Sequence, residues 1–260
     1  MTAGRFSLLG RKALVTGGNS GIGRAIALAL AESGADIVLH HFGDEEGARA
    51  VRSAVEKMGR SAVLLEADFS MPGNAEALAE AALQSGPVDI LIANAAIERR
   101  RPWPEIEPSD IEAHLSVNFT SLFQISKALV PPMAERGWGR VVAIGSVLAK
   151  RPRAETVIYA SLKSAQLTAI RALARDVAAR GVTMNVVSPG AIETERNADR
   201  YADAAFRRAV EAKIPVGRAG RPEDCVGPVL LLCSEAGAYI TGADLPVDGG
   251  WSIGDAPINN

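Results

Sequence analysis

The sequence predicts a doubly wound α/β fold, a three-layer sandwich in which helices cover both faces of a mainly parallel, seven-stranded sheet. Apolar runs of strand length alternate with amphipathic runs of helix length almost to the end of the chain. The early strand-like runs are apolar on both faces, which is typical of a parallel sheet covered on each side. A glycine-rich turn also joins the first apolar run to the first helical one. Repeated strand–helix–strand units of this kind imply right-handed crossovers, with ligands bound at the carboxyl ends of the strands.

The elements follow in order along the chain. The expected strands are Lys12–Thr16, Asp36–His40, Ala62–Glu66, Ile90–Ala93, Val141–Gly145, Thr183–Val187 and Leu245–Val247. The expected helices are 21–33, 44–58, 74–85, 108–136, 156–180 and 222–234. We find no linker or internal repeat, so residues 1–260 are predicted to form one domain. Residues 188–213 begin with Pro-Gly and lack a long apolar face. We expect a flap over the substrate there, with a solvated surface insertion as the alternative.

Composition excludes several classes of protein. Of the 260 residues 48% are hydrophobic and the net charge is −2, so neither nucleic acid nor an anionic membrane is an expected partner. No apolar run reaches the length of a membrane span, and the first ten residues do not resemble a signal peptide, so a cytoplasmic location is expected. Cys225 and Cys233 are predicted to be buried thiols, and the three histidines form no zinc pattern, so no metal is expected.

The turn Thr16–Gly23 is the first functional signal. Gly17 allows a sharp turn, Gly21 allows the backbone to approach a diphosphate, and Gly23 allows close packing of helix on strand. The free N–H groups of the following helix favour an anion. This strand–turn–helix context predicts a Rossmann-type dinucleotide site, although a tight turn uses the same glycines without a ligand.

Four polar residues downstream are candidates for chemistry. Tyr159 and Lys163 are four residues apart, so a helix brings both onto one face, where the ammonium would lower the pKa of the phenol. Ser146 follows a predicted strand, where a turn or cap serine is the common alternative. Asn118 interrupts an apolar helical pattern, either as a functional residue or as a satisfied buried amide.

Together these positions resemble the short-chain dehydrogenase/reductase family, in its single-domain branch, over nearly the whole chain. The matching positions are Thr16–Gly23, Asp68, Asn94-Ala95, Asn118, Ser146, Tyr159, Lys163, Pro189-Gly190, Thr194, Ile240–Gly242 and Val247–Gly250. The resemblance implies an NAD(P)-dependent oxidoreductase acting on the carbonyl or alcohol of a small molecule. It also implies a homotetramer built on the long helices around Asn118 and Tyr159 and on the final helix and strand.

The resemblance also implies roles for individual residues. Tyr159 would be the general acid and base, and Ser146 would bind the substrate oxygen. Lys163 would hold the nicotinamide ribose, and Asn118 would position a water in a proton relay. Cofactor contacts are implied for Gly17, Asn19, Ser20, Gly21, Ile22, Gly23, His41, Phe42, Asp68, Phe69, Asn94, Ala95, Tyr159, Lys163, Pro189, Gly190, Ile192 and Thr194.

The chain departs from the family pattern at two places. After the fourth strand it has Ala93-Asn94-Ala95-Ala96, where the family often has Asn-Asn-Ala-Gly. At the end of the second strand, His41 and Phe42 stand where NAD-preferring members usually carry an acid. No carboxylate there repels a 2′-phosphate, and no arginine attracts it. NADP is therefore the favoured cofactor, with NAD possible.

Charged residues in the expected pocket walls indicate the substrate. Arg153 and Glu155, with Leu148, lie between Ser146 and Tyr159 and are the tentative substrate contacts. They favour a small polar molecule, namely a sugar, a polyol or a hydroxy acid. Many of the arginines nearby could instead face water or a neighbouring subunit. A 3-oxoacyl-thioester (acyl carrier protein) reductase is the alternative enzyme, with the run Arg99–Arg101 available to the carrier. A catalytically idle, cofactor-sensing protein is the alternative from another class.

Overall fold

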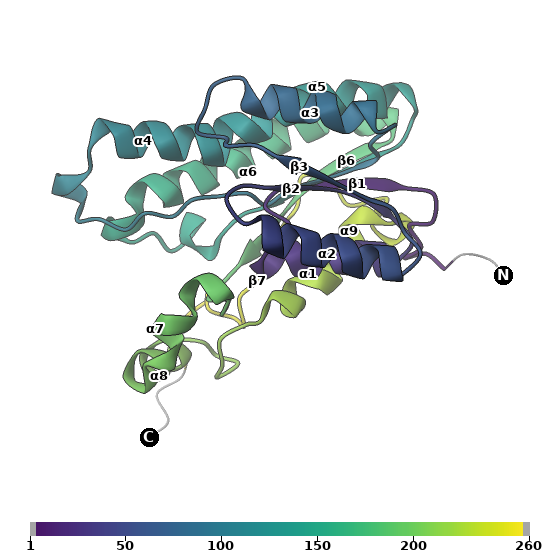
Figure 1. Ribbon diagram of the computed structural model, residues 1–260. Helices are drawn as coiled ribbons and strands as arrows, with labels where there is room; N and C mark the ends of the chain where they lie inside the picture. The colour runs from purple at the N-terminus through teal and green to yellow at the C-terminus, as the bar shows by residue number, and fades with distance from the viewer. Residues whose placement is uncertain (1–3, 257–260) are drawn as a thin grey trace.

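The computed structural model describes residues 4–256 and contains a seven-stranded sheet between two layers of helices (Figure 1). The strands are β1 (Lys12–Val15), β2 (Asp36–His41), β3 (Ala62–Glu66), β4 (Ile90–Ala93), β5 (Gly139–Ile144), β6 (Val182–Pro189) and β7 (Asp244–Val247). Their spatial order is β3-β2-β1-β4-β5-β6-β7, and neighbouring strands pair in parallel throughout. All seven predicted strands are confirmed, and the doubly wound fold with them.

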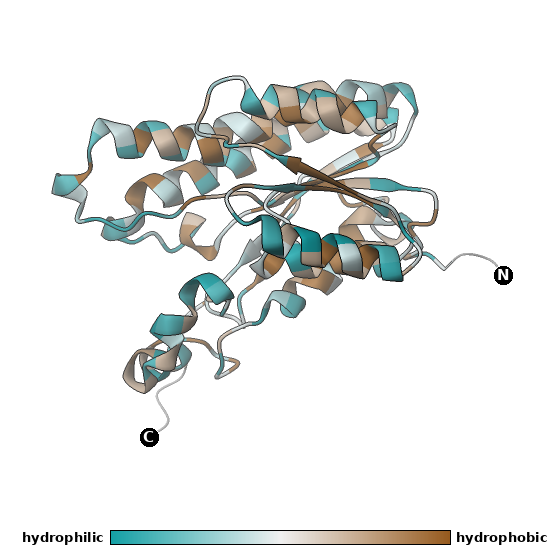
Figure 2. Ribbon diagram, viewed as in Figure 1, coloured by the Kyte–Doolittle hydropathy of each residue, from teal (hydrophilic) through white to brown (hydrophobic). Residues whose placement is uncertain are grey.

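Helices cover both faces of the sheet. On one face lie α3 (Asn74–Gln84), α4 (Pro108–Leu115), α5 (Ser121–Glu135) and α6 (Val157–Val177), and on the other lie α1 (Gly21–Glu32), α2 (Glu45–Lys57) and α9 (Val226–Cys233) (Figure 1). Figure 2 shows hydrophobic residues along the central strands and a mixture of hydrophobic and hydrophilic residues along the helices. Along β1, Leu14 packs into one core and Val15 into the other, because successive strand side chains alternate between faces.

The helix predicted over residues 108–136 is present, with one irregular turn inside it. A π-helical turn, Ser116–Thr120, separates α4 from α5. Inside this turn Asn118 is almost fully buried, and its side chain hydrogen-bonds to the backbone of Ile97 on the segment after β4. Such single π-turns are frequent at functional sites. The predicted ends of two other helices, 178–180 and 222–225, are 3₁₀ turns.

The segment predicted as a flap, 188–213, begins inside the sheet and continues outside it. Its first two residues belong to β6. The remainder carries two short helices that the sequence pattern did not predict, α7 (Ala198–Ala202) and α8 (Ala204–Glu211), and these project away from the sheet (Figure 1). Arg207 ties them to the loop after β6 through a 2.7 Å ion pair with Glu193.

The two cysteines are as expected. Cys225 and Cys233 are buried and form no disulfide, and burial raises the pKa of each thiol to about 12. Within residues 4–256, no helix has the length and apolar character that crossing a membrane requires.

Candidate active site

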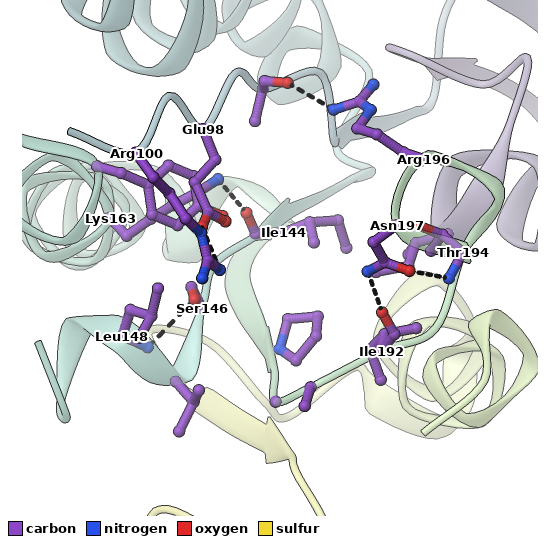
Figure 3. Close-up of a pocket in the computed structure, with 18 of the residues that line it drawn as sticks. Glu98, Arg100, Ile144, Ser146, Leu148, Lys163, Ile192, Thr194, Arg196 and Asn197 are labelled. Carbon is purple, nitrogen blue, oxygen red and sulfur yellow. Dashed lines mark hydrogen bonds and ion pairs between the residues drawn. The ribbon is translucent and has the colours of Figure 1, made fainter. Parts of the chain in front are cut away.

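A cleft of about 540 Å³ opens at the carboxyl ends of the strands (Figure 3). It lies where the chain, having wound outward from β1 to β3, crosses back to β4, the point at which doubly wound folds bind ligands. Among the residues predicted to bind cofactor or substrate, those lining this cleft are Ile22, Asn94, Ser146, Leu148, Arg153, Tyr159, Lys163, Pro189, Gly190, Ile192 and Thr194. The fold thus gathers at one edge residues that are far apart in the chain.

The glycine turn after β1 needs each of its three predicted glycines for a physical reason. Gly17 and Gly21 have φ angles of +61° and +52°, which side-chain-bearing residues rarely adopt. Gly23 is limited by space, because a Cβ atom there would lie 2.2 Å from the carbonyl oxygen of Gly17. The turn therefore packs directly against the first turn of α1.

Asn94 holds this turn from the end of β4. Its Nδ2 donates to the carbonyl oxygens of Thr16 (2.9 Å) and Gly17 (3.0 Å). In return the Thr16 hydroxyl accepts the backbone N–H groups of Asn94 and Ala95 at 2.9 and 3.0 Å. The single asparagine of the Asn-Ala-Ala sequence is thus used in fixing the turn.

His40 is a site residue that the sequence analysis missed. Its Nδ1 accepts the N–H of Gly17 at 3.0 Å, and its Nε2 lies 2.9 Å from the carbonyl oxygen of Ala67. The ring stacks on Phe69 with centroids 4.2 Å apart. Burial lowers the pKa of His40 to about 4, so the neutral ring donates from Nε2 and accepts at Nδ1. The sequence feature that could have revealed His40 is a histidine within an otherwise apolar strand.

The rim beyond β2 differs from expectation. His41 is buried, with 3% of its surface exposed, while Phe42 is exposed. The carboxylate that reaches the glycine turn is Asp44, whose Oδ2 accepts from Nδ2 of Asn19 at 2.8 Å and which also caps α2. The hydrogen bond from Asn19, which has the larger effect, and the one from the backbone N–H of Gly47 lower the pKa of Asp44. An acidic residue therefore does lie near the glycine turn, a few residues beyond His41 and Phe42.

Tyr159, Lys163 and Ser146 all line the cleft. Figure 3 shows Ser146 and Lys163 there. The spacing of four residues on α6 places Nζ of Lys163 5.4 Å from the centroid of the Tyr159 ring. Nζ also donates to the carbonyl oxygen of Ile144, at the end of β5, over 2.7 Å. Ser146 follows that strand, and its Oγ accepts the N–H of Leu148 at 3.1 Å, so its hydroxyl proton points elsewhere.

The pKa values of these groups correct one expectation. Burial raises the pKa of Tyr159 above its usual value of 10, the charge of Glu98 raises it further, and the hydrogen bond with Ser146 opposes the rise. Burial also lowers the pKa of Lys163 to about 8, with Glu98 acting against it. The predicted lowering of the phenol pKa is therefore not found: burial has the largest effect, and the cations that act against it are Arg196 and Arg100 rather than Lys163.

Asn118 lies behind the cleft rather than in its lining. Its Oδ1 accepts from the N–H of Ile97 (2.8 Å), and its Nδ2 donates to the carbonyl oxygen of the same residue (2.9 Å). The main-chain oxygen of Asn118 accepts from Nε2 of Gln166. The water that was predicted to bind Asn118 stays a prediction.

Charged groups surround the mouth of the cleft. Arg100 is paired with Glu98 at 2.7 Å. Arg153 packs on the ring of Trp251 at 5.3 Å and lies 3.9 Å from the carboxylate of Glu155. The flap adds Arg196, which donates to the carbonyl oxygen of Ala96 (3.3 Å, Figure 3), and Arg200, which packs on Phe206.

Glu155 does not line this cleft, which corrects its prediction as a substrate contact. It borders a separate small hollow formed with residues 99–114, because its carbonyl oxygen accepts the N–H of Arg101 and holds it there. Arg99 and Arg101 both reach the carboxylate of Asp110, at 3.3 and 3.2 Å. Their charge is thus largely compensated by α4.

The turn and α1 suit the diphosphate of a dinucleotide. The backbone N–H of Gly21 already binds a carboxylate, Oε2 of Glu195, at 3.2 Å, and the guanidinium of Arg24 contacts Oε1. An anion is therefore accommodated where the first turn of α1 presents free N–H groups. Arg24 and Glu195 are further site residues that the sequence did not reveal, since they are distant in the chain.

Comparison with known proteins gives consistent matches along the chain. A family model described as enoyl-(acyl carrier protein) reductase matches residues 17–252. An L-rhamnose 1-dehydrogenase (NAD(P)(+)) of Sphingomonas is 33% identical, over 95% of this chain and 98% of its own length.

Two solved structures superpose on nearly the whole molecule. A 3-oxoacyl (acyl-carrier-protein) reductase of Agrobacterium tumefaciens with NADP bound has a TM-score of 0.92 and 39% identity, covering 96% of this chain and 97% of its own. A gluconate 5-dehydrogenase of Burkholderia cenocepacia in complex with NADP and tartrate has a TM-score of 0.89 and 33% identity, covering 97% and 99%.

Proposed function

The chain belongs to the short-chain dehydrogenase/reductase family, and on this premise we propose that it interconverts a small hydroxy acid and its keto form with NADP. It is an oxidoreductase acting on CH–OH groups, as its relatives are. NADP is the proposed cofactor because the similar structures carry it, and NAD remains possible. The carboxylate of Asp44 near Asn19 is the feature that favours NAD.

One observation supports the choice of an anionic substrate. Among residues 4–256, five cationic side chains line the cleft, Arg100, Arg153, Lys163, Arg196 and Arg200, against one carboxylate, that of Glu98. That carboxylate is already paired with Arg100. A carboxylate on the substrate would supply the missing partner, whereas a long aliphatic chain would leave these charges uncompensated.

The proposed roles follow from the local chemistry. Bound nicotinamide supplies or takes up the hydride. Tyr159 keeps its proton at neutral pH because burial raises its pKa, so it can donate from Oη to the substrate oxygen during reduction. Ser146 can donate its hydroxyl proton to the same oxygen, because accepting the N–H of Leu148 leaves that proton available to Tyr159 or to the substrate. Lys163 has two further N–H donors for ribose hydroxyls after its bond to Ile144.

For the reduction, kcat/KM is expected to be constant below about pH 8 and to fall above it. Because burial lowers the pKa of Lys163 to about 8, the ammonium form predominates below that pH and the amine above it. Tyr159 stays protonated through the same range, so its titration does not contribute to the fall of kcat/KM above pH 8. The pH profile of kcat/KM with NADPH reports groups of the free enzyme. A profile that stays flat to about pH 10 would contradict the assignment to Lys163.

Arg153→Ala is expected to raise KM for a keto sugar acid by about 10- to 100-fold, with a smaller effect on kcat. The range corresponds to the loss of one hydrogen-bonded contact with a charged group. Neutral ketoses of the same length should be affected little. Initial rates at 340 nm with NADPH and with NADH, across keto acids, ketoses and an acetoacetyl thioester, provide the test.

Arg99→Ala is the matched control, because Arg99 lies outside the cleft, at the neighbouring small hollow, and is paired with Asp110. It should leave the keto-acid kinetics unchanged. Efficient turnover of the thioester alone, insensitive to Arg153→Ala, would refute the hydroxy-acid proposal in favour of a 3-oxoacyl-thioester reductase.

We also infer a homotetramer, as the family resemblance implies. Exposed apolar side chains support it on the helices expected at subunit contacts: Ile111 and Leu115 on α4, Phe123 on α5 and Val157 at the start of α6. One domain for the whole chain, a mobile flap over the substrate and a cytoplasmic location stay predictions.

A further inference from the structure

Residues 195 and 196 of the flap bridge two walls of the dinucleotide groove. On one wall, the carboxylate of Glu195 accepts the N–H of Gly21 over 3.2 Å and contacts the guanidinium of Arg24. On the other, Arg196 donates to the carbonyl oxygen of Ala96, just beyond β4, over 3.3 Å. Glu195 and Arg24 are 171 positions apart, so this contact joins the start of the chain to the segment after β6.

Glu195 lies where the proposed diphosphate needs to bind. Gly21 opens the first turn of α1, and its N–H is one of the donors that a helix N-terminus offers to an anion. A hydrogen bond from its own backbone N–H, and the charge of Arg24, lower the pKa of Glu195, so it is ionised at neutral pH. A carboxylate and a diphosphate cannot share this N–H, because each needs it as a donor and like charges repel.

We propose that Glu195 is an internal competitor for the diphosphate, which dinucleotide binding displaces from Gly21, leaving Arg24 to pair with the diphosphate instead. We call the contact of Glu195 with Gly21 and Arg24 the latch. This inference rests on the proposed use of the groove by NADP. It adds two residues that set cofactor affinity: Glu195, which lowers it, and Arg24, which raises it.

The latch has a measurable consequence. If the binding-competent state is only a fraction of the free protein, the apparent dissociation constant rises in inverse proportion to that fraction. Both partners are about half exposed, with side-chain exposures of 46% and 53%, so solvent screening keeps the latch weak. We therefore expect the population with the latch formed to exceed the population without it by about 3- to 10-fold.

Glu195→Gln is expected to tighten NADPH binding by about 3- to 10-fold, because the neutral amide competes poorly for the N–H and for Arg24. Titration followed by the nicotinamide fluorescence of NADPH measures this without turnover. Asp199→Asn removes the same charge from an exposed flap position and should leave the affinity unchanged. Glu195→Asp keeps the charge but shortens the side chain, and should also tighten binding if contact rather than the general field is responsible.

Arg24→Ala completes a double-mutant cycle. In the Glu195→Gln protein it removes only the contact with the diphosphate, so NADPH binding should weaken by about 3- to 10-fold. In the wild type it also weakens the latch, so the loss should be smaller. Equal losses in the two backgrounds would show that Arg24 is not exchanged between carboxylate and diphosphate.

The possible outcomes distinguish failure of the latch proposal from failure of the proposed function. A wild type that binds NADPH as tightly as Glu195→Gln, or an equal gain in Asp199→Asn, would overturn the latch alone. A wild type that binds neither NADPH nor NADH would overturn the proposed function and the latch with it.

Discussion

Replacing Tyr159 with Phe is expected to lower turnover by at least about 100-fold, the usual contribution of a positioned general acid or base. The change keeps the aromatic ring and removes only the hydroxyl, whose proton burial retains at neutral pH. Burial of the ring against Leu148 and Trp251 should survive, so the fold and the groove for NADPH should persist.

Two measurements make this test specific. The affinity for NADPH should stay within about 3-fold of wild type, and Tyr239→Phe, at a fully exposed tyrosine, should leave turnover unchanged. Turnover of Tyr159→Phe within a few-fold of wild type would remove Tyr159 from the mechanism. A collapse of NADPH affinity would instead mark the hydroxyl as part of the binding site.

Replacing Gly23 with Ala is expected to weaken NADPH binding by at least about 10-fold and to destabilise the fold by about 3 kcal/mol, at the upper end for overpacking. The added methyl would lie 2.2 Å from the carbonyl oxygen of Gly17 and 2.5 Å from Nδ2 of Asn94. Both neighbours belong to the hydrogen-bonded turn, so relief requires moving α1 away from β1 and opening the diphosphate site. Thermal denaturation and NADPH titration measure the two effects.

Gly227→Ala is the matched control within another helix. No atom lies within 4 Å of a Cβ built at Gly227, and its φ angle is not positive. The substitution should therefore stabilise the protein by roughly 0.4–1 kcal/mol, by restricting the unfolded chain, and leave NADPH affinity unchanged. If Gly23→Ala behaved like Gly227→Ala, close packing of the turn would not be what Gly23 provides.

The sequence determined those features that depend on short spacings. Seven apolar runs specified seven strands, because parallel strands covered on both faces are apolar throughout. The order of strand, glycine turn and helix located the groove, and the four-residue spacing placed Tyr159 and Lys163 on one side of α6. These relations are fixed within a few residues and need no knowledge of distant partners.

The tertiary structure alone decided which distant groups meet and how buried they are. Asn118 lies in a π-helical turn inside a long helix, and its amide hydrogen-bonds to the backbone of Ile97, which the fold brings beside it. Glu195 reaches Gly21 across most of the chain, and Glu155 is kept out of the cleft by a contact with Arg101. The high pKa of Tyr159 follows mainly from burial, and no local spacing reports how much solvent the assembled fold removes.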